Sequence, residues 1–314
     1  MSAPVSYVLR PAKNMERKMI CEASARLAMI APLHKYAYVG FGGLTFQDFG
    51  MFHHRLGVRD MISIEKRTSD RHRFEFNRPF SCIKMQWGIS HDVLPLLSWK
   101  KPTIIWLDYE VHPNSEVLQD ISLVASRIRS GSLLVVTVAA DPGGGSDPSA
   151  QRDRMATLIA RVGKARVPVD LKPEHLAKWG TARTYKRIIS DVIETTINDR
   201  NAALATSERV AYRQIFNFHY QDGRKMLTVG GIIVNPDDAQ RLGPDDFRDL
   251  RFVRTGEDEY EIRFPILTGK ETRHLDARLP TGRLRRAPAW LPDEDRQSYR
   301  DLYRYFPNFV EAEI

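Results

Sequence analysis

The stretch Tyr36-Ala-Tyr-Val-Gly-Phe-Gly-Gly43 carries the strongest fold signal in the chain. Tyr36–Val39 is predicted to be a short strand, and it runs directly into glycines at positions 40, 42 and 43. A helix is predicted next over Gln47–Leu56, because Gly57 is a typical helix stop. A strand, a glycine-rich turn and a helix in this order form the first unit of a parallel α/β sheet.

The same alternation continues on both sides of this unit. Further strands are predicted over Asp60–Ile64, Ser81–Gln86, Thr103–Leu107 and Ser132–Ala139. Further helices are predicted over Met15–Ile30, Ser69–Asn77 and Ser115–Arg127, the last with Ser115 as its N-cap. The fifth strand is apolar on both faces, as a central parallel strand should be. The first half of the chain therefore predicts an α/β fold with helices on both faces of a mostly parallel sheet.

The second half adds a hairpin and an extension. Residues 151–207 are predicted to be helical, and strands over Tyr212–Tyr220 and Lys225–Val234 flank the pair Asp222-Gly223, which favours a type I′ turn. The tail is predicted to contain a strand (Glu259–Phe264), a basic arm (Lys270–Arg286) and a helix (Asp293–Tyr305). We divide the chain into an N-terminal helical segment (1–35), a sheet domain (36–235) and a C-terminal extension (236–314).

Composition narrows the class of protein. The chain has 314 residues, 42% of them hydrophobic, and a formal net charge of +8, which is typical of a globular protein and favours acidic partners. Two cysteines, Cys21 and Cys82, exclude a disulfide framework within the chain. No apolar run approaches the ~18 residues needed to cross a bilayer, and the N-terminus lacks an apolar signal core. We therefore expect a cytoplasmic protein that is not embedded in a membrane.

Candidate functional residues follow the predicted strands. In an open parallel sheet, ligands bind beyond the carboxyl ends of the strands. The residues in these positions are Gly40, Gly42 and Gly43 after the first strand, Glu65 after the second, Asp92 after the third, Asp108, Tyr109 and Glu110 after the fourth, and Asp141 after the fifth. Glycines allow the backbone to approach a ligand closely, and an acid after the second strand can accept hydrogen bonds from ribose hydroxyls. The pattern predicts an adenosine-type cofactor.

Taken together, Tyr38-Val39-Gly40-Phe41-Gly42-Gly43, Ile64-Glu65, Ser90-His91-Asp92 and Leu107-Asp108-Tyr109-Glu110, followed by the Asp-Gly hairpin, resemble the class I S-adenosylmethionine-dependent methyltransferases. The resemblance covers roughly residues 30–235. It implies a Rossmann-like, seven-stranded sheet whose last strand is antiparallel. It also implies that Gly40, Gly42 and Gly43 pass under the methionine part of S-adenosylmethionine, that Glu65 holds the ribose and Asp92 the adenine edge, and that Asp108 lies near the transferred methyl group.

The chain departs from this family where Tyr38 stands in place of the usual acidic residue of the first motif. Asp108 or the upstream segment Lys13–Glu16 are the candidates to hold the amino group of the cofactor instead. No Asp-Pro-Pro-Tyr signature and no Pro-Cys nucleophile occurs, which disfavours methylation of base amino groups or of cytosine carbon. We therefore expect an oxygen acceptor, with Asp108, Tyr109 and Glu110 as the catalytic residues.

Several alternatives stay open at the level of the sequence. Asp108, Glu110 and Asp141 are oxygen ligands that suit Mg²⁺, but we expect Glu110 to face solvent and predict no metal site. The chain is also compatible with a non-catalytic methyltransferase-fold subunit of a larger assembly. A nicotinamide-dependent oxidoreductase shares the glycine turn and the acid, although the hairpin disfavours it. Arg283, Arg285 and Arg286 are candidates for nucleic-acid contacts, and the oligomeric state is open.

Overall fold

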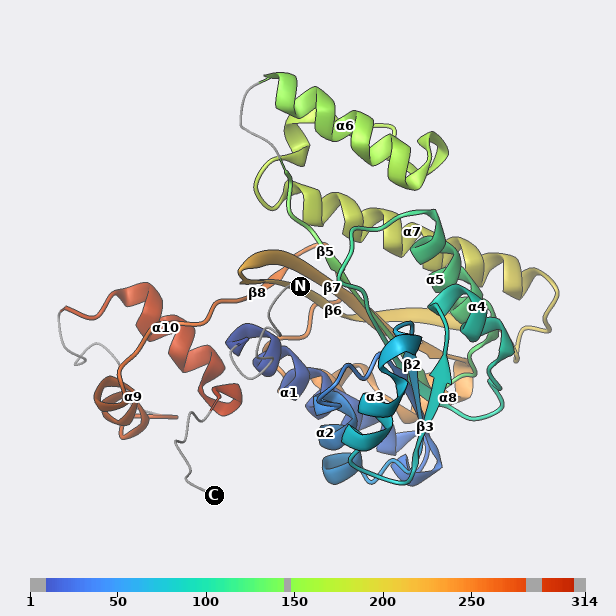
Figure 1. The fold of residues 1–314 in the computed structure, drawn as a ribbon, viewed down its shortest axis with the longest axis horizontal. Coiled ribbons are helices and arrows are strands. Elements are labelled where there is room, and N and C mark those ends of the chain that lie inside the picture. Colours follow the sequence, from blue (N-terminus) through green and yellow to red (C-terminus); the bar gives the residue numbers. More distant parts are fainter. Residues whose placement is uncertain (1–9, 144–147, 281–289, 308–314) are drawn as a thin grey trace.

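The computed structural model describes residues 10–143, 148–280 and 290–307. Within them, eight strands form one sheet in the order β3-β2-β1-β4-β5-β7-β6-β8 (Figure 1). The strands are β1 (Ala37–Gly40), β2 (Asp60–Glu65), β3 (Ile83–Trp87), β4 (Thr103–Asp108), β5 (Ser132–Ala139), β6 (Ala211–Asp222), β7 (Arg224–Val234) and β8 (Tyr260–Ile262).

The pairing of the strands confirms the fold predicted from the sequence. Strands β1 to β5 pair in parallel, whereas β7 is antiparallel to both β5 and β6. The first seven strands are thus a Rossmann-like sheet with an antiparallel last strand. The strand predicted over Glu259–Phe264 adds an eighth member, β8, which pairs in parallel with β6 at the edge of the sheet.

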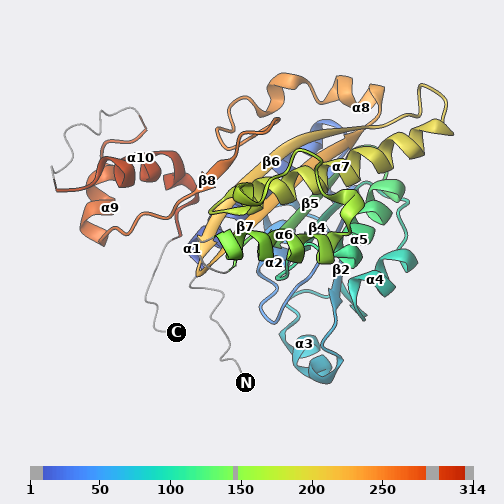
Figure 2. The same ribbon diagram turned by 90° about the horizontal axis from the view of Figure 1, so that it is seen from above.

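Helices cover both faces of the sheet (Figures 1 and 2). The core on one face includes side chains of α1 (Pro11–Ala25), α2 (Gln47–Leu56) and α3 (Arg71–Asn77). The core on the other face includes side chains of α4 (Ser90–Val93), α5 (Ser115–Arg127), α6 (Pro148–Val162) and α7 (Gly180–Ala202). Strands β4 and β5 lie between the two cores, and β5 is buried along its whole length.

Several local predictions need correction. The helix predicted from Met15 begins earlier, at Pro11, because proline is well tolerated in the first turn of a helix. The N-cap of α5 is Asn114 rather than Ser115, since the Asn114 side chain accepts a hydrogen bond from the N–H of Val117. The β6–β7 pairing continues to Asp222 and Arg224, so Gly223 alone lies between them, at φ 87°. A type I′ turn would place two residues there.

The C-terminal extension contains α8 (Pro236–Arg241), α9 (Gly269–Asp276) and α10 (Asp293–Leu302). Helices α9 and α10 lie beyond the β8 edge of the sheet, whereas α8 directly follows β7 and lies away from them (Figure 2). A small third core joins α9 to α10 through Leu275, Leu291 and Tyr299. The predicted nucleic-acid contacts Arg283, Arg285 and Arg286 lie outside the described residues. Among the described helices, none is long and apolar enough to span a bilayer.

Candidate active site

The glycine turn follows β1 at the carboxyl edge of the sheet, as the sequence predicts. The N–H of Gly42 donates to Ser63 Oγ at 3.1 Å, and a Cβ at this position would lie 2.6 Å from that oxygen and 2.7 Å from the Phe46 ring. Gly43 has φ +54°, and a Cβ built there would meet nothing within 4 Å. The turn is therefore closely packed at Gly42 and leaves open backbone at Gly43.

Glu65 ends β2 beside this turn, at 8% exposure. Its Oε1 accepts a hydrogen bond from the N–H of Arg67 at 2.9 Å and lies 3.5 Å from Arg67 Nε. Among the described residues, no hydrogen bond to Oε2 is recorded. One carboxylate oxygen thus fixes the side chain, and the other is left to accept hydrogen bonds from a ligand.

The acid that organises the neighbouring rim is Asp120 of α5 rather than Asp92. Asp92 is exposed in the short helix α4. Asp120 is 2% exposed, and it accepts hydrogen bonds from Ser90 Oγ at 2.5 Å and from the Tyr109 hydroxyl at 2.6 Å. Its other oxygen lies 3.2 Å from His91 Nδ1. The role of Asp92 at the adenine edge stays a prediction, and Asp120 is a residue that the sequence analysis missed.

Asp108, at the end of β4, is paired with a buried lysine. Lys13 Nζ of α1 lies 2.7 Å from Asp108 Oδ1 and 2.8 Å from Glu16 Oε2. Lys13 is 3% exposed and Glu16 is fully buried, whereas the Asp108 side chain is 28% exposed. The Lys13 ammonium therefore lies between the Asp108 carboxylate, which reaches the surface, and the Glu16 carboxylate, which does not.

Neighbouring strands complete the polar surroundings of Glu16. The Thr228 hydroxyl of β7 donates a hydrogen bond to Glu16 Oε1. Thr228 also shares a 2.7 Å hydrogen bond with the Thr137 hydroxyl of β5. Trp106 Nε1 donates to the same Thr137 hydroxyl at 2.9 Å. Burial raises the pKa of Glu16 above its usual value, and the Lys13 charge opposes that rise. Lys13 Nζ also lies 4.4 Å from the Trp106 ring centroid, a cation–π distance.

The three residues predicted to be catalytic separate in space. Asp108 and Tyr109 are consecutive in sequence, so their side chains leave the strand on opposite faces. Asp108 faces α1, whereas Tyr109 faces α5, where burial and the Asp120 charge raise its pKa well above the usual value. Glu110 is exposed, with its side chain 3.8 Å from Arg10. Asp108 and Tyr109 therefore face different sides of the sheet, and the catalytic roles of Asp108, Tyr109 and Glu110 stay predictions.

Tyr38, which stands in place of the acid in the first motif, reaches a different acid. Its hydroxyl donates to Asp48 Oδ2 of α2 at 2.5 Å. Burial raises the pKa of both groups, with the Asp48 charge adding to the rise at Tyr38. Arg17 of α1 contributes a nearby positive charge. Helices α1 and α2 thus bring Glu16 and Asp48 to the rim where the sequence of β1 lacks a carboxylate.

A cavity of about 1050 Å³ opens beside this cluster. Asp108 and Lys13 form part of its wall, together with Glu110, the β6–β7 turn and residues 261–264 and 266 of the extension. The carboxyl edge of the sheet therefore offers a space large enough for a small molecule.

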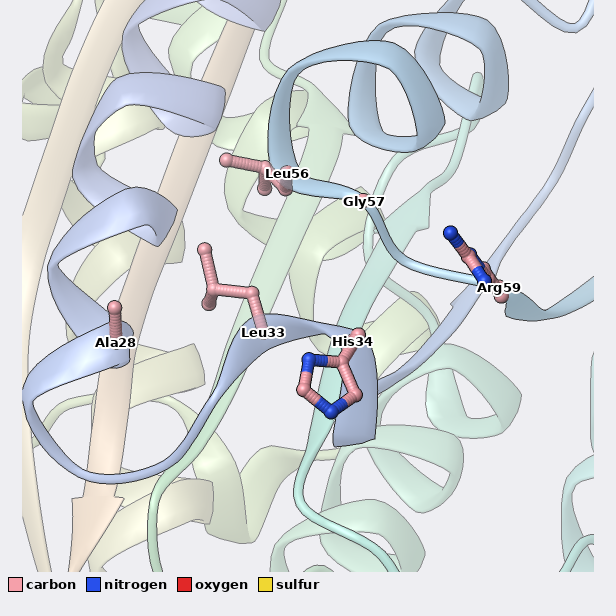
Figure 3. Close-up of a pocket in the computed structure, with 6 residues that line it drawn as sticks. All are labelled: Ala28, Leu33, His34, Leu56, Gly57 and Arg59. Atoms are coloured by element: carbon pink, nitrogen blue, oxygen red, sulfur yellow. The ribbon is translucent and has the colours of Figure 1, made fainter.

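A second cavity, of about 540 Å³, lies at the opposite edge (Figure 3). Leu33 and Leu56 face the same space there, and His34 and Arg59 complete its rim. His34 precedes β1 and Arg59 precedes β2, so this cavity lies at the amino ends of the strands. It is separate from the predicted site.

No group of three or more histidine, cysteine, aspartate or glutamate side chains in the described ranges is arranged to hold a metal ion. Asp141, the third oxygen donor considered from the sequence, accepts hydrogen bonds from Arg224 Nε at 2.9 Å and the N–H of Lys225 at 2.8 Å.

Solved structures with similar folds include an O-methyltransferase family protein from Burkholderia thailandensis (12% identity, 70% of this chain and 56% of that chain covered, TM-score 0.36). They also include Trm1 from Pyrococcus horikoshii in complex with S-adenosyl-L-methionine (9% identity, 72% of this chain and 57% of that chain covered, TM-score 0.41). A third is spermidine synthase from Thermotoga maritima (12% identity, 79% of this chain and 68% of that chain covered, TM-score 0.39). The chain thus spans 56% of the length of the Burkholderia protein. No curated protein matches it.

The match to a protein-family model is far more extensive. Residues 5–314 match the family described as "Putative O-methyltransferase". This match includes the glycine turn, the Lys13–Glu16–Asp108 cluster and the C-terminal extension, and its description agrees with the methyl transfer to oxygen predicted from the sequence. The chain belongs to this O-methyltransferase family.

Proposed function

We propose that this protein transfers the methyl group of S-adenosylmethionine to a hydroxyl oxygen held next to Asp108. The observation that carries the proposal is the contact between Lys13 Nζ and Asp108 Oδ1, 2.7 Å long, in the wall of a 1050 Å³ cavity. Membership of an O-methyltransferase family supports the reaction class. Both charged groups lie at the carboxyl end of the sheet, where ligands of such folds bind.

The residues at this edge fit the proposed cofactor. Gly43 leaves open backbone after β1, and the Glu65 carboxylate is fixed through one oxygen by Arg67, which suits the other for a ribose hydroxyl. The Asp48 carboxylate is a candidate to attract the amino group of the cofactor, because Tyr38 supplies no charge of its own. When bound, S-adenosylmethionine supplies an electrophilic methyl group on a sulfonium.

The protein's own residues would then prepare the acceptor. A hydroxyl beside Asp108 can donate its proton to the carboxylate, which makes the oxygen a better nucleophile. The adjacent Lys13 ammonium stabilises the negative charge that develops on that oxygen. Glu16 holds Lys13 in place from the buried side. Orientation contributes as well, since holding two reactants in line is worth up to about 7–11 kcal/mol.

Calorimetric titration with S-adenosylmethionine and S-adenosylhomocysteine tests the cofactor part of the proposal. We expect both to bind, and Glu65→Gln to weaken binding by about 5- to 150-fold, as expected for loss of a charged hydrogen-bonding partner worth about 1–3 kcal/mol. Glu75→Gln is the matched control, because Glu75 is an exposed residue of α3. Absence of binding by either compound would leave the non-catalytic alternative in place of the enzyme.

A further inference from the structure

We infer that the methyl acceptor is a bulky, uncharged and largely apolar hydroxyl compound, and that the C-terminal extension forms the wall that selects it. This inference rests on the proposed function, since it places the acceptor in the cavity beside Asp108. It concerns the chemistry of the remaining walls, which neither the family match nor the cofactor determines.

The size of the cavity favours a molecule with several rings. Its volume of about 1050 Å³ lies at the upper end of the ~300–1,000 Å³ typical of small-molecule sites. A small alcohol would leave most of this space to water and would lack the contacts that orient it for transfer. A larger acceptor can reach from the Asp108 end to the residues of the extension.

Apolar side chains also line the cavity. Met226 comes from the β6–β7 hairpin, and Ile262, Phe264 and Ile266 come from the extension. Tyr220 of the hairpin lies beside the charged cluster, with its ring centroid 5.8 Å from Lys13 Nζ. Phe264 is held in place by stacking on Phe306, with ring centroids 4.7 Å apart. Ile266 is 90% exposed, so its side chain is accessible to a molecule bound in the cavity. Because Tyr220, Met226 and Ile262 are buried, Phe264 and Ile266 offer most of the apolar surface that an aromatic ring system can contact.

Within the described residues, each cation of the cavity wall lies next to a carboxylate of the protein. Lys13 pairs with Asp108 and Glu16, Arg10 with Glu110, Arg224 with Asp141, and Arg263 with Glu294 and Asp295. The wall contributes two further carboxylates, Asp222 and Glu261. Phosphate recognition needs cations that are available for bidentate hydrogen bonds. A phosphate-bearing acceptor, including a nucleic acid, would therefore displace existing ion pairs and meet an excess of carboxylates.

The polar and apolar regions together define the orientation of the acceptor. The hydroxyl would meet Asp108 and Lys13 at one end, and the ring system would extend toward Phe264 and Ile266. This arrangement makes the extension a specificity determinant. A substitution at Ile266 would leave the chemistry at Asp108 unaltered, since Ile266 lies after β8, in a segment of the chain separate from the charged cluster.

A matched pair of probes tests the inference by direct binding. Estradiol is an uncharged tetracyclic phenol, and estradiol 17-sulfate keeps the same phenol while adding an anionic group. Isothermal titration is run on the whole protein, with and without S-adenosylhomocysteine, and a 12-nucleotide RNA is titrated in parallel. We expect estradiol to bind at least tenfold more tightly than the sulfate, and the RNA not to compete with estradiol.

Two exposed hydrophobic residues provide the variant and its control. Ile266→Asp should weaken estradiol binding at least fivefold and leave the affinity for S-adenosylhomocysteine unchanged. Val169→Asp should change neither, because Val169 is fully exposed and is absent from the cavity wall. Equal or tighter binding of the sulfate, displacement of estradiol by RNA, or an Ile266→Asp protein that binds estradiol normally would each overturn the inference. Binding of estradiol without binding of S-adenosylhomocysteine would instead overturn only the proposed function.

Discussion

Replacing Lys13 by methionine tests the charge cluster on which the site depends. The methionine side chain fills nearly the same volume but removes the ammonium between Glu16 and Asp108. Because Lys13 and Glu16 are buried, the variant leaves a carboxylate without its partner in a poorly solvated place. Breaking a buried ion pair in this way costs about 3–5 kcal/mol. For a cooperative chain of 314 residues, a loss of ~3 kcal/mol corresponds to a melting temperature lower by about 4–5 °C.

The loss should depend on pH in a definite direction. Burial raises the pKa of Glu16 in the folded protein above its usual value of 4.5, so between pH 4.5 and that raised pKa the folded state keeps a proton that the unfolded chain has released. Stability from this group is therefore greatest below about pH 4.5 and falls as the pH rises through the folded pKa. Without the Lys13 charge that opposes the rise, Lys13→Met should lose little stability near pH 5 and the full amount near pH 8.

Thermal and urea denaturation of Lys13→Met at pH 5 and pH 8 measures this effect. Lys84→Met is the control, since the Lys84 side chain is 67% exposed and surface pairs contribute about 0–1 kcal/mol. Combining Lys13→Met with Glu16→Gln should recover part of the loss at pH 8, because the second change removes the stranded charge. A Lys13→Met protein that is as stable as the wild type at pH 8, or equally destabilised at both pH values, would refute the reasoning.

Three further predictions concern the rim of the sheet. Asp108→Asn should lower the rate of methyl transfer from labelled S-adenosylmethionine by about 10²–10⁴-fold, the range for loss of a general base, while calorimetry finds the cofactor affinity unchanged; an undiminished rate would exclude Asp108 as the base. Gly42→Ala should destabilise the protein by about 1–3 kcal/mol in urea denaturation, because its Cβ would lie 2.6 Å from Ser63 Oγ, whereas Gly256→Ala, with nothing within 4 Å, should not. Asp120→Asn should raise the KM for S-adenosylmethionine about tenfold, as expected for loss of about 1.4 kcal/mol of charged hydrogen bonding, with kcat little changed, if Asp120 holds Ser90 and Tyr109 in place at the cofactor end of the site; a fall in kcat alone would contradict this role.

Local elements of the fold could be predicted because their signals lie within a few consecutive residues. The predicted bounds of α2 (Gln47–Leu56) and β5 (Ser132–Ala139) agree with the structure, since hydrophobic periodicity and a glycine stop are local features. The position of Glu65 at the end of β2 follows in the same way. Even the separation of Asp108 from Tyr109 could have been predicted, because successive residues of a strand face opposite sides.

The partners within the site depended on the tertiary structure. Lys13 and Asp108 are 95 residues apart in sequence, and they meet only because α1 packs across the face of the sheet that carries Asp108. Asp120 meets Ser90 for a similar reason, since α5 and α4 lie side by side in space. Charged side chains in a sequence have many possible partners, and which pair forms depends on the packing of distant elements. The sequence by itself thus determined the sheet and the strand ends where ligands bind, whereas only the tertiary structure decided which charges share the buried site.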